Sequence, residues 1–267
     1  MNVPAKADGE RFQSGAQEYA DYLKTPEGRL RSDLAFANLQ DFICVRQAKD
    51  ALHALDIGCG TGAAAVRLAR LGMNVTILDS SSAMLDIAKR TVEKAGISGN
   101  LVLQHGDAMR LADLFPAASF DVILCHNVLE FFDDPTSVLS AAARALRDSL
   151  AILSVLVRNR AGELFKAAIQ AGDLAAAEKT LTADWAQESL YGGRVRLFAP
   201  DSLQAMLKSA SLEVIAERGV RVLADYLPSK ISRSAEYQRI FELERKLGTR
   251  TEYAAVARYT QCIARLP

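Results

Sequence analysis

Apolar residues recur along most of the chain either in short continuous runs or in longer stretches with helical spacing. The runs of strand length lie at residues 52–57, 74–78, 101–104, 120–125 and 150–157. Amphipathic stretches typical of helices follow three of these runs, at residues 63–71, 82–95 and 135–146. Because strand–helix–strand units cross over in the right-handed sense, this alternation predicts a mostly parallel sheet with helices on both faces.

The pattern changes before residue 52 and after residue 158. Residues 1–10 are predicted to be a loose tail, followed by helices at 14–23 and 26–45, the second capped by Thr25 ahead of Pro26. Alanine-rich helical pieces in residues 159–198 predict an inserted helical cap, which is too short for a core of its own. A helix, a strand, a helix and a strand then predict an antiparallel closure of the sheet edge, at residues 200–210, 212–217, 232–247 and 259–264.

Composition narrows the class of protein. Half of the 267 residues are hydrophobic, and 32 basic side chains balance 32 acidic ones. A net charge of zero argues against non-specific nucleic-acid binding by charge alone, but not against a local basic patch. The four cysteines form no C-x-x-C pair, which argues against structural zinc. Because no signal peptide or membrane span is visible, we expect a cytoplasmic protein with no metal and no membrane partner.

A glycine-rich turn follows the first apolar run. Residues 56–62 read Asp-Ile-Gly-Cys-Gly-Thr-Gly, between a strand-like run and a helix-forming stretch. Glycines at such a turn let the backbone approach a ligand, and free N–H groups at the helix start face it. Asp79 ends the next apolar run, where βαβ units hold a ribose diol. The turn therefore predicts a site for a nucleoside cofactor.

Two classes of cofactor fit this turn. The first two glycines and Ala63 satisfy the dinucleotide fingerprint, with Asp79 at the expected distance. However, Asp56 precedes the first glycine by two residues, where it would repel a pyrophosphate and attract a sulfonium or an α-amino group. Asp107, after the third run, is placed to accept from an adenine amine. These two acids favour a cationic methyl donor, and a nicotinamide oxidoreductase stays as an alternative.

With these motifs the sequence resembles the class I S-adenosylmethionine-dependent methyltransferases. The resemblance rests on residues 56–62, 78–85, 106–108 and 120–130. It implies a Rossmann-like, doubly wound, mostly parallel seven-stranded α/β sheet, with S-adenosylmethionine as cofactor. Where the family commonly has a Pro-Gly-Gly turn, residues 146–149 read Leu-Arg-Asp-Ser, away from the cofactor. The candidate cofactor-binding residues are Arg31, Asp56, Gly58, Cys59, Gly60, Asp79, Ser80, Met84, Asp107, Ala108 and His126.

The resemblance also implies a part for several of these residues. It places Asp79 on the ribose hydroxyls, Asp107 and Ala108 around the adenine, and His126 near the sulfonium. Three members of the set also have a simpler interpretation. His126 is then a hydrogen-bonded core histidine, Cys59 a small filler, and Arg31, like Arg29, part of a solvated helix face.

A narrower resemblance, to the bacterial tRNA 5-carboxymethoxyuridine methyltransferases, extends outside the cofactor core. Phe12 and residues 25–31, 128–135, 219–227 and 257–259 carry it. It implies that Arg31 contacts the cofactor. It further implies a tRNA partner, in which the carboxylate of a modified wobble uridine is converted to a methyl ester. The cap departs from this family, because it lacks a lysine-rich run that would help to hold RNA.

The acceptor side is less sharply defined. Methyl transfer is an in-line displacement that depends on proximity and alignment, so we name no obligatory catalytic residue. An ionised carboxylate is already nucleophilic and needs orientation rather than a base. The candidates for this orientation are Arg221, Tyr226, Arg258 and Tyr259.

Each of these candidates also has a structural interpretation. Arg221 lies in an apolar run and needs an anion, which is either Asp225 or a substrate group. The two tyrosines either stack on a base or pack in the core. Trp185 in the cap has the same two interpretations.

We therefore predict a single methyltransferase domain with four parts. They are an N-terminal helical lid, a cofactor-binding half, a cap insertion, and a C-terminal sheet edge with helices, at residues 1–50, 51–158, 159–198 and 199–267. The favoured acceptor is 5-carboxymethoxyuridine in tRNA. A small metabolite is the alternative, because the divergent cap is where the choice of acceptor would reside.

Overall fold

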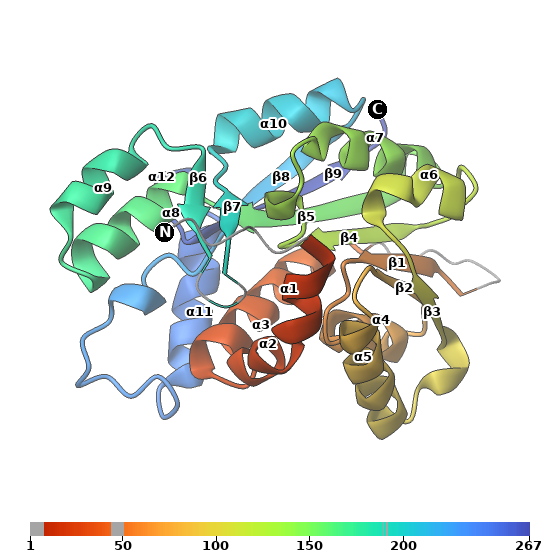
Figure 1. Ribbon diagram of the computed structural model, residues 1–267, viewed down its shortest axis with the longest axis horizontal. Helices are drawn as coiled ribbons and strands as arrows, with labels where there is room; N and C mark the ends of the chain where they lie inside the picture. Colours follow the sequence, from red (N-terminus) through yellow and green to blue (C-terminus); the bar gives the residue numbers. More distant parts are fainter. Residues whose placement is uncertain (1–7, 44–50, 189, 191) are drawn as a thin grey trace.

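A seven-stranded sheet with the strand order β3-β2-β1-β4-β5-β9-β8 forms the centre of the molecule (Figure 1). The computed structural model describes residues 8–43, 51–188, 190 and 192–267. The strands of the sheet are β1 (His53–Ile57), β2 (Asn74–Asp79), β3 (Leu101–His105), β4 (Val122–His126), β5 (Ile152–Arg158), β8 (Glu213–Val220) and β9 (Tyr259–Arg265). The first five strands run parallel, while β9 is antiparallel to β5 and β8. The predicted sheet and its antiparallel edge are thus confirmed.

Helices precede, separate and follow these strands. Before the sheet lie α1 (Asp8–Ser14), α2 (Ala16–Tyr22) and α3 (Pro26–Gln40). Between the parallel strands lie α4 (Ala63–Arg70), α5 (Ser82–Ala95), α6 (Leu111–Leu114) and α7 (Pro135–Ala145). After β5 come α8 (Arg160–Phe165), the π-helical turn η4 (Lys166–Gln170), α9 (Leu174–Thr180), α10 (Pro200–Ser209), α11 (Tyr237–Gly248) and α12 (Thr251–Ala254).

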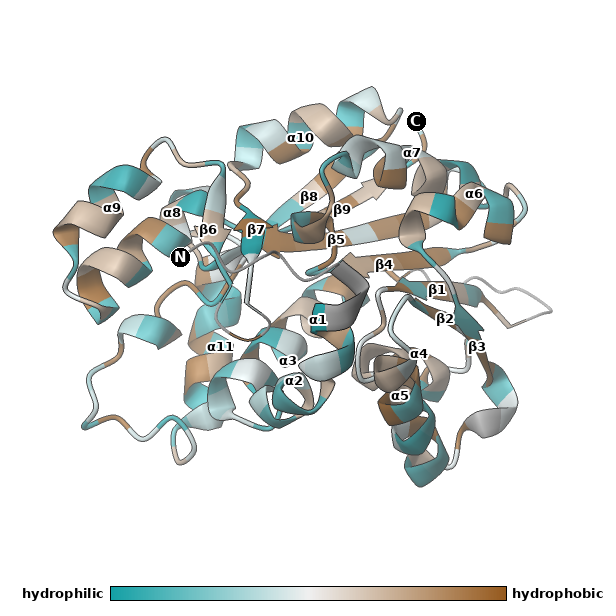
Figure 2. Ribbon diagram, in the orientation of Figure 1, coloured by the Kyte–Doolittle hydropathy of each residue, from teal (hydrophilic) through white to brown (hydrophobic). Residues whose placement is uncertain are grey.

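Helices cover both faces of the sheet. On one face, α7 and α10 bury Leu139 and Leu203 against the strands. On the other face, α3, α4 and α5 bury Leu39, Leu68 and Ala88. Figure 2 shows the central strands as largely hydrophobic, whereas the outer surfaces of the helices are hydrophilic. This three-layer arrangement leaves the carboxyl ends of the parallel strands as the edge where ligands bind in such sheets.

Two helix starts in the cofactor-binding half and the lid follow from their capping residues. Thr25 Oγ1 accepts a hydrogen bond from Gly28 N (3.1 Å), and Pro26 occupies the first turn of α3. Ser81 Oγ accepts from Met84 N (3.3 Å) at the start of α5. A side-chain oxygen at this position satisfies a backbone N–H group that has no partner inside the helix. The predicted Thr25 cap is confirmed.

The N-terminal prediction needs correction. A helix already begins at Asp8 within the predicted tail, and the predicted helix at 14–23 is two helices that meet at Gly15. Gly15 N donates to Arg11 O, and Gly15 O accepts from Tyr19 N, so the turn between α1 and α2 keeps its backbone bonds. The helix predicted to reach residue 45 ends at Gln40. Residues 44 and 45 lie outside the described residues.

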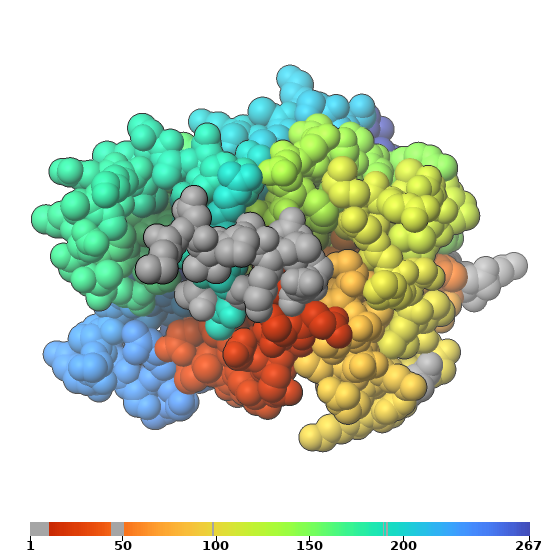
Figure 3. All heavy atoms as spheres, in the orientation of Figure 1, coloured from red at the N-terminus to blue at the C-terminus, as the bar shows by residue number. Residues whose placement is uncertain are grey.

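A helical cap was predicted, but the cap is not purely helical. It also contains a two-stranded antiparallel hairpin of β6 (Trp185–Gln187) and β7 (Arg194–Arg196). Three residues per strand are too few for an alternating pattern to be recognised. Near the C-terminus, β8 continues to Val220 and α11 begins at Tyr237, five residues later than predicted. Figure 3 shows the N-terminal helices, the cap and α5 on one face of the molecule. Within the described ranges, no helix has the length and apolar character that a bilayer-spanning segment needs.

Candidate active site

A cavity of about 570 Å³ opens at the carboxyl ends of β1, β2 and β4. Its walls come from the strand ends, from α1–α3 and from the cap. The predicted cofactor residues that line it are Arg31, Gly58, Gly60, Asp79, Ser80, Met84, Asp107, Ala108 and His126. Asp56 and Cys59 line a smaller hollow of about 70 Å³, which shares Arg31, Gly58 and His126 with the cavity. The fold thus brings these residues to one place.

The glycine turn is fixed to β2 by its backbone. Gly58 N and Cys59 N both donate to Leu78 O, at 2.8 and 3.1 Å. Gly58 has φ +64°, and a Cβ atom there would lie 2.4 Å from Val128 Cγ2. Residues other than glycine rarely adopt this backbone conformation, and at this position their Cβ atom would also clash with Val128. Glycine at position 58 therefore lets the turn close against the loop after β4 while its backbone faces the cavity.

Asp79 holds the second half of the turn. Its carboxylate accepts hydrogen bonds from Gly60 N and Ser81 N, both at 2.9 Å. Burial raises the pKa of Asp79, and the backbone donors, led by Ser81, oppose this rise. Each carboxylate oxygen has more than one lone pair, so Asp79 keeps capacity to accept from a ligand hydroxyl. The acid that ends β2 therefore orders the turn and also faces the cavity.

Asp56 is a buried acid without a hydrogen-bond donor on one oxygen. It is 3% exposed, and its Oδ2 has no partner among the described residues. Burial, and to a lesser degree the neighbouring Asp79, raises the pKa of Asp56 to about 7. A cationic group nearby would favour the ionised form of such a carboxyl group. A sulfonium donor fits this environment, whereas a pyrophosphate does not.

Arg31 lines both the cavity and the smaller hollow. Arg31 is 6% exposed, and its Nη2 donates to Tyr19 Oη at 2.9 Å. The guanidinium also lies 5.1 Å from the ring centroid of Tyr22 and 5.6 Å from that of Tyr259. Among the described residues, no carboxylate pairs with it. The solvated-face interpretation is therefore wrong for Arg31, but it fits Arg29, which is exposed and lies 3.4 Å from Asp33.

His126 ends β4 as a neutral imidazole. Burial, and then the positive charge of Arg31, lower the pKa of His126 to about 3. Its Nε2 lies 2.8 Å from Ser154 Oγ, which accepts from Gln261 Nε2 (3.0 Å). Gln261 Oε1 in turn accepts from Asn38 Nδ2 (3.0 Å). The ring is thus both a hydrogen-bonded core group and part of the cavity wall, which unites the two interpretations of the sequence.

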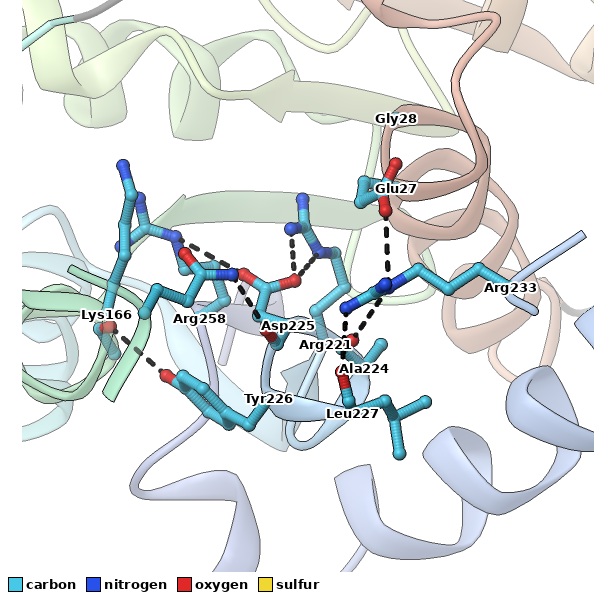
Figure 4. Close-up of polar contacts among 12 residues, drawn as sticks. Glu27, Gly28, Lys166, Arg221, Ala224, Asp225, Tyr226, Leu227, Arg233 and Arg258 are labelled. Carbon is cyan, nitrogen blue, oxygen red and sulfur yellow. Dashed lines mark hydrogen bonds and ion pairs between the residues drawn. The ribbon is translucent and has the colours of Figure 1, made fainter. Parts of the chain in front are cut away.

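The four residues predicted to orient the acceptor do not line the cavity. Figure 4 shows three of them, Arg221, Tyr226 and Arg258, close to Asp225. Arg221 Nε donates to Asp225 Oδ1 (2.8 Å), and its Nη1 donates to Tyr22 Oη (2.9 Å). Arg258 Nη1 donates to Glu163 (2.5 Å), and its Nε lies 3.8 Å from the second oxygen of Asp225. The sequence left two possible anions for Arg221, namely Asp225 and a substrate group. In this structure Arg221 is paired with Asp225.

The tyrosines of this group sit on the same network. Tyr226 Oη donates to Gly162 O at 3.4 Å. Tyr259 is 4% exposed, and its ring lies within 6 Å of Arg31, Arg221 and Arg258. Burial alone would raise the pKa of Tyr259, but these arginines, led by Arg31, lower it to about 7. Tyr259 therefore connects the buried charge network to Arg31, which lines the cavity.

Among the polar residues of the cavity wall that the sequence did not predict as site residues are Arg158, Glu188 and Glu130. Arg158 ends β5, and its guanidinium pairs with Glu188 from the cap. Glu130, 1% exposed, accepts from Asn127 Nδ2 (3.0 Å) and Arg158 N (2.9 Å) through Oε1, while no partner reaches its Oε2 among the described residues. Arg158 carried the same signal as Asp79 and His126, because it is a polar residue at the end of a buried run.

Comparison with known proteins agrees with this geometry. The sequence model of a protein family described as a methyltransferase domain matches residues 55–152 of this chain. The tRNA 5-carboxymethoxyuridine methyltransferase of Escherichia coli K12 is 30% identical over 250 residues, which are 91% of this chain and 90% of that enzyme. This chain belongs to the S-adenosylmethionine-dependent methyltransferases. The expected enzyme class and fold are thereby confirmed.

Other relatives of this methyltransferase place it more broadly. The ubiquinone biosynthesis O-methyltransferase of Hahella chejuensis is 30% identical over 187 residues, 67% of this chain and 71% of that enzyme. Among solved structures, a putative methyltransferase in complex with the Trm112 activator of Haloferax volcanii covers 98% of both chains, with TM-score 0.64 and 16% identity. A methyltransferase from Thermotoga maritima, a possible histamine N-methyltransferase, covers 97% of this chain and 99% of its own, with TM-score 0.58 and 17% identity. At these identities the structures show the shared fold alone.

Proposed function

We propose that this methyltransferase converts the carboxylate of 5-carboxymethoxyuridine, at the wobble position of tRNA, to its methyl ester. The similarity to the Escherichia coli enzyme carries the proposal, because it extends over nine-tenths of both chains. It therefore includes regions outside the cofactor-binding half, where the choice of acceptor resides. The ubiquinone-pathway relative matches only 67% of this chain.

The cavity residues suit a sulfonium cofactor. S-adenosylmethionine, when bound, supplies a methyl group on a cationic sulfur that an in-line nucleophile can accept. Asp79 would receive the ribose hydroxyls, and Asp107 with Ala108 would border the adenine. Arg31, which has no carboxylate partner among the described residues, would pair with the carboxylate of the donor. The orphaned oxygen of Asp56 supports a cation close to the glycine turn.

A carboxylate acceptor also suits the chemistry of this wall. A carboxylate needs no deprotonation, so the protein has only to align it with the methyl group. His126 is a weak base, because its pKa is lowered to about 3 by burial and by Arg31. Its neutral ring would not repel a cationic sulfonium. The chain's contribution is then orientation and exclusion of water rather than proton transfer.

A local basic patch at the cavity rim supports a tRNA partner. Arg194 and Arg196 lie over the ring of Trp185, at 4.1 and 4.6 Å from its centroid. Both arginines contact Asp133, which lines the cavity. Aromatic and arginine planes of this kind stack on unpaired bases, and arginines bind phosphates. The rim thus offers contacts to an anticodon loop although the net charge of the chain is zero.

Mass spectrometry of tRNA nucleosides tests the proposal directly. In a strain that lacks this gene, the methyl ester of 5-carboxymethoxyuridine should disappear and the free carboxylate should accumulate. The purified protein should restore the ester on that tRNA when S-adenosylmethionine is added. An unchanged level of the ester in the deletion strain would contradict the proposal.

A small metabolite methylated on a hydroxyl oxygen, for example that of a phenol, is the second candidate, because one relative is a ubiquinone biosynthesis O-methyltransferase. Such an acceptor has to lose a proton, so its methylation rate would follow the ionisation of the phenol. Parallel assays with a catechol and with the carboxylate-bearing tRNA separate the two functions. Methylation of the catechol alone would favour the second candidate.

A further inference from the structure

The cavity wall contains two cationic side chains among the described residues, and they differ in their partners. Arg31 lies beside tyrosines and pairs with no carboxylate in the described part of the chain. Arg158 forms a close ion pair with Glu188, which also lines the cavity, and a longer one with Glu163 (3.9 Å), which does not. The proposed reaction brings two carboxylates to this cavity, one on the methyl donor and one on the acceptor. The number of cations equals the number of carboxylates to be bound.

The Arg158–Glu188 pair joins a rigid element to a small one. Arg158 is the last residue of the central strand β5, and its backbone N–H donates to Glu130 Oε1 at 2.9 Å. Glu188 lies in the turn between β6 and β7, where its Oε1 accepts from Leu190 N (2.9 Å). These two strands have three residues each and pair only with one another in the described structure. The hairpin is held to the body by side-chain contacts, such as those of the buried Val195 and of Arg196 with Asp133 O, and not by strand pairing with the main sheet. Glu188 can therefore leave while Arg158 stays in place in the central strand.

We propose that Arg158 binds the carboxylate of the acceptor, and that Glu188 occupies this position until the acceptor displaces it. This inference rests on the proposed function. The exchange replaces one carboxylate by another on the same guanidinium, so the buried charge of Arg158 stays compensated throughout. Glu188 moves towards solvent with its hairpin. The side chain of Glu188 is 1% exposed in the closed arrangement, which shows how completely it fills the position.

Such an exchange would also select the acceptor. A neutral analogue of the nucleoside cannot replace Glu188 on Arg158 without leaving the guanidinium with Glu163 alone, at 3.9 Å. Leaving a buried charge without a close partner is costly, so the site discriminates against ligands that lack the carboxylate. The other buried arginines are less suited to this task. Arg221 and Arg258 already share Asp225 and Glu163, and neither lines the cavity.

The substitution Glu188→Gln tests the exchange. Glutamine has the shape of glutamate and keeps an oxygen for Leu190 N, but it no longer competes as an anion. We expect the KM for tRNA bearing 5-carboxymethoxyuridine to fall by about fivefold, with kcat changed by less than about twofold. An unchanged or increased KM would overturn the proposal, because Glu188 would then merely hold Arg158 in position.

Asp184→Asn is the matched control. Asp184 precedes the same hairpin and pairs with Arg160 at 2.7 Å, at the start of α8. This variant removes one negative charge from the same region, but Asp184 does not line the cavity. The KM should stay at the wild-type value. An equal fall of KM in both variants would indicate a general charge effect and overturn the exchange.

The double variant Arg158→Gln/Glu188→Gln tests the anchor without leaving a buried charge alone. Its KM for the carboxylate-bearing tRNA should rise by about 30-fold. Inhibition by 5-methoxyuridine, which lacks the carboxylate, should not weaken, because the charge that selects against it is gone. The affinity for S-adenosylhomocysteine, measured by calorimetry, should change little. The assignment of Arg158 would be overturned if the double variant kept the wild-type KM. It would also be overturned if the affinity for 5-methoxyuridine fell as much as that for the carboxylate-bearing tRNA.

Failure of this inference is distinguishable from failure of the proposed function. If the wild-type protein binds S-adenosylhomocysteine but never methylates the carboxylate-bearing tRNA, the proposed function is wrong and the inference falls with it. If the wild-type protein methylates that tRNA but the variants deviate from the expected pattern, only the inference is wrong.

Discussion

The proposed donor side and the proposed acceptor side of this cavity are built in different ways. On the donor side, Asp56, Gly58, Asp79 and Asp107 come from three consecutive strand ends within about 50 residues of sequence, and backbone hydrogen bonds hold the turn between them. On the acceptor side, Arg158 pairs with a residue of the cap. Behind it lies one buried network, formed by Glu163 of α8, by Arg221 and Asp225 after β8, and by Arg258 before β9.

This difference shows what each side needs in order to exist. Local turns and helix starts fix the donor side, so single polar residues there are free to face a ligand. Charge pairing between distant segments fixes the acceptor side, where most polar groups are committed to one another. Substitutions should therefore separate the two sides. Donor-side changes should reduce ligand affinity, and changes in the buried network should reduce stability first.

The largest effect is expected from Arg221→Ala. This change removes the guanidinium that donates two hydrogen bonds to the buried Asp225 Oδ1 and leaves only Arg258, at 3.8 Å from Oδ2. Removing one member of a buried pair costs about 3–5 kcal/mol. The free energy of unfolding, measured by urea denaturation, should fall by that amount. Arg239→Ala is the control, because the side chain of Arg239 is 87% exposed and its ion pair with Glu236 is long, at 3.9 Å. A stable Arg221→Ala protein with an increased KM for the acceptor would return Arg221 to the acceptor side.

The sequence predicted the donor side well because its signals are local. Asp79 and His126 each follow a buried run, and in a parallel sheet all such positions meet at one edge. The turn glycines need no partner distant in sequence to be recognised. The same rule applies to Arg158, which ends a buried run. The regular pattern stops at residue 159, so the sequence does not mark this position as clearly as the ends of the earlier runs.

The acceptor side was harder to predict for a physical reason. An arginine in an apolar run must meet an anion, but the sequence does not tell which anion it meets. Asp225 lies four residues after Arg221, whereas the partners of Arg158 and Arg258 lie 30 and 95 residues away. The hairpin that supplies Glu188 has strands too short for a pattern. Only the fold joins these segments.

The second largest effect is expected from Asp79→Ala, on the donor side. This change removes the acceptor of Gly60 N and Ser81 N, together with the proposed contact to the ribose. Hydrogen bonds to a charged group are each worth about 1.5–3 kcal/mol, so the affinity for S-adenosylhomocysteine should fall by about 100-fold. Calorimetric titration measures it. Asp86→Ala, at an exposed position of α5, should bind as the wild type does. If Asp79→Ala binds with wild-type affinity, the ribose assignment is wrong.

A third prediction uses the pH dependence of Asp56. Its folded-state pKa of about 7 is raised above the ordinary value, so its contribution to stability is complete below pH about 4 and is lost as pH rises through 7. Asp56→Asn removes this loss. Relative to the wild type, the variant should gain about 2 kcal/mol of unfolding free energy between pH 5 and pH 8.

Denaturant titrations at several pH values measure this gain. Parallel stability curves for the two proteins would show that Asp56 does not titrate in this range. The affinity for S-adenosylmethionine should fall in the same variant, and by more than the affinity for S-adenosylhomocysteine, because only the former has a cationic sulfur. An Asp56→Asn protein that is more stable and binds the donor more weakly would place the buried acid on the donor side by function.

The smallest effect is expected at the rim, from Arg194→Ala. Arg194 is 64% exposed, and its contact with Asp133, itself 88% exposed, is too weak to matter for stability. If the rim binds an anticodon loop, the affinity for tRNA should fall by about threefold, and the slope of log affinity against log salt should decrease by about 1. Lys179→Ala, at an exposed position of α9, is the control. The KM for the free nucleoside should not change, because a nucleoside has no phosphate for Arg194 to bind. A loss that is equal for nucleoside and tRNA would instead assign Arg194 to the cavity, and the acceptor side would then end at the hairpin rather than extend onto the surface.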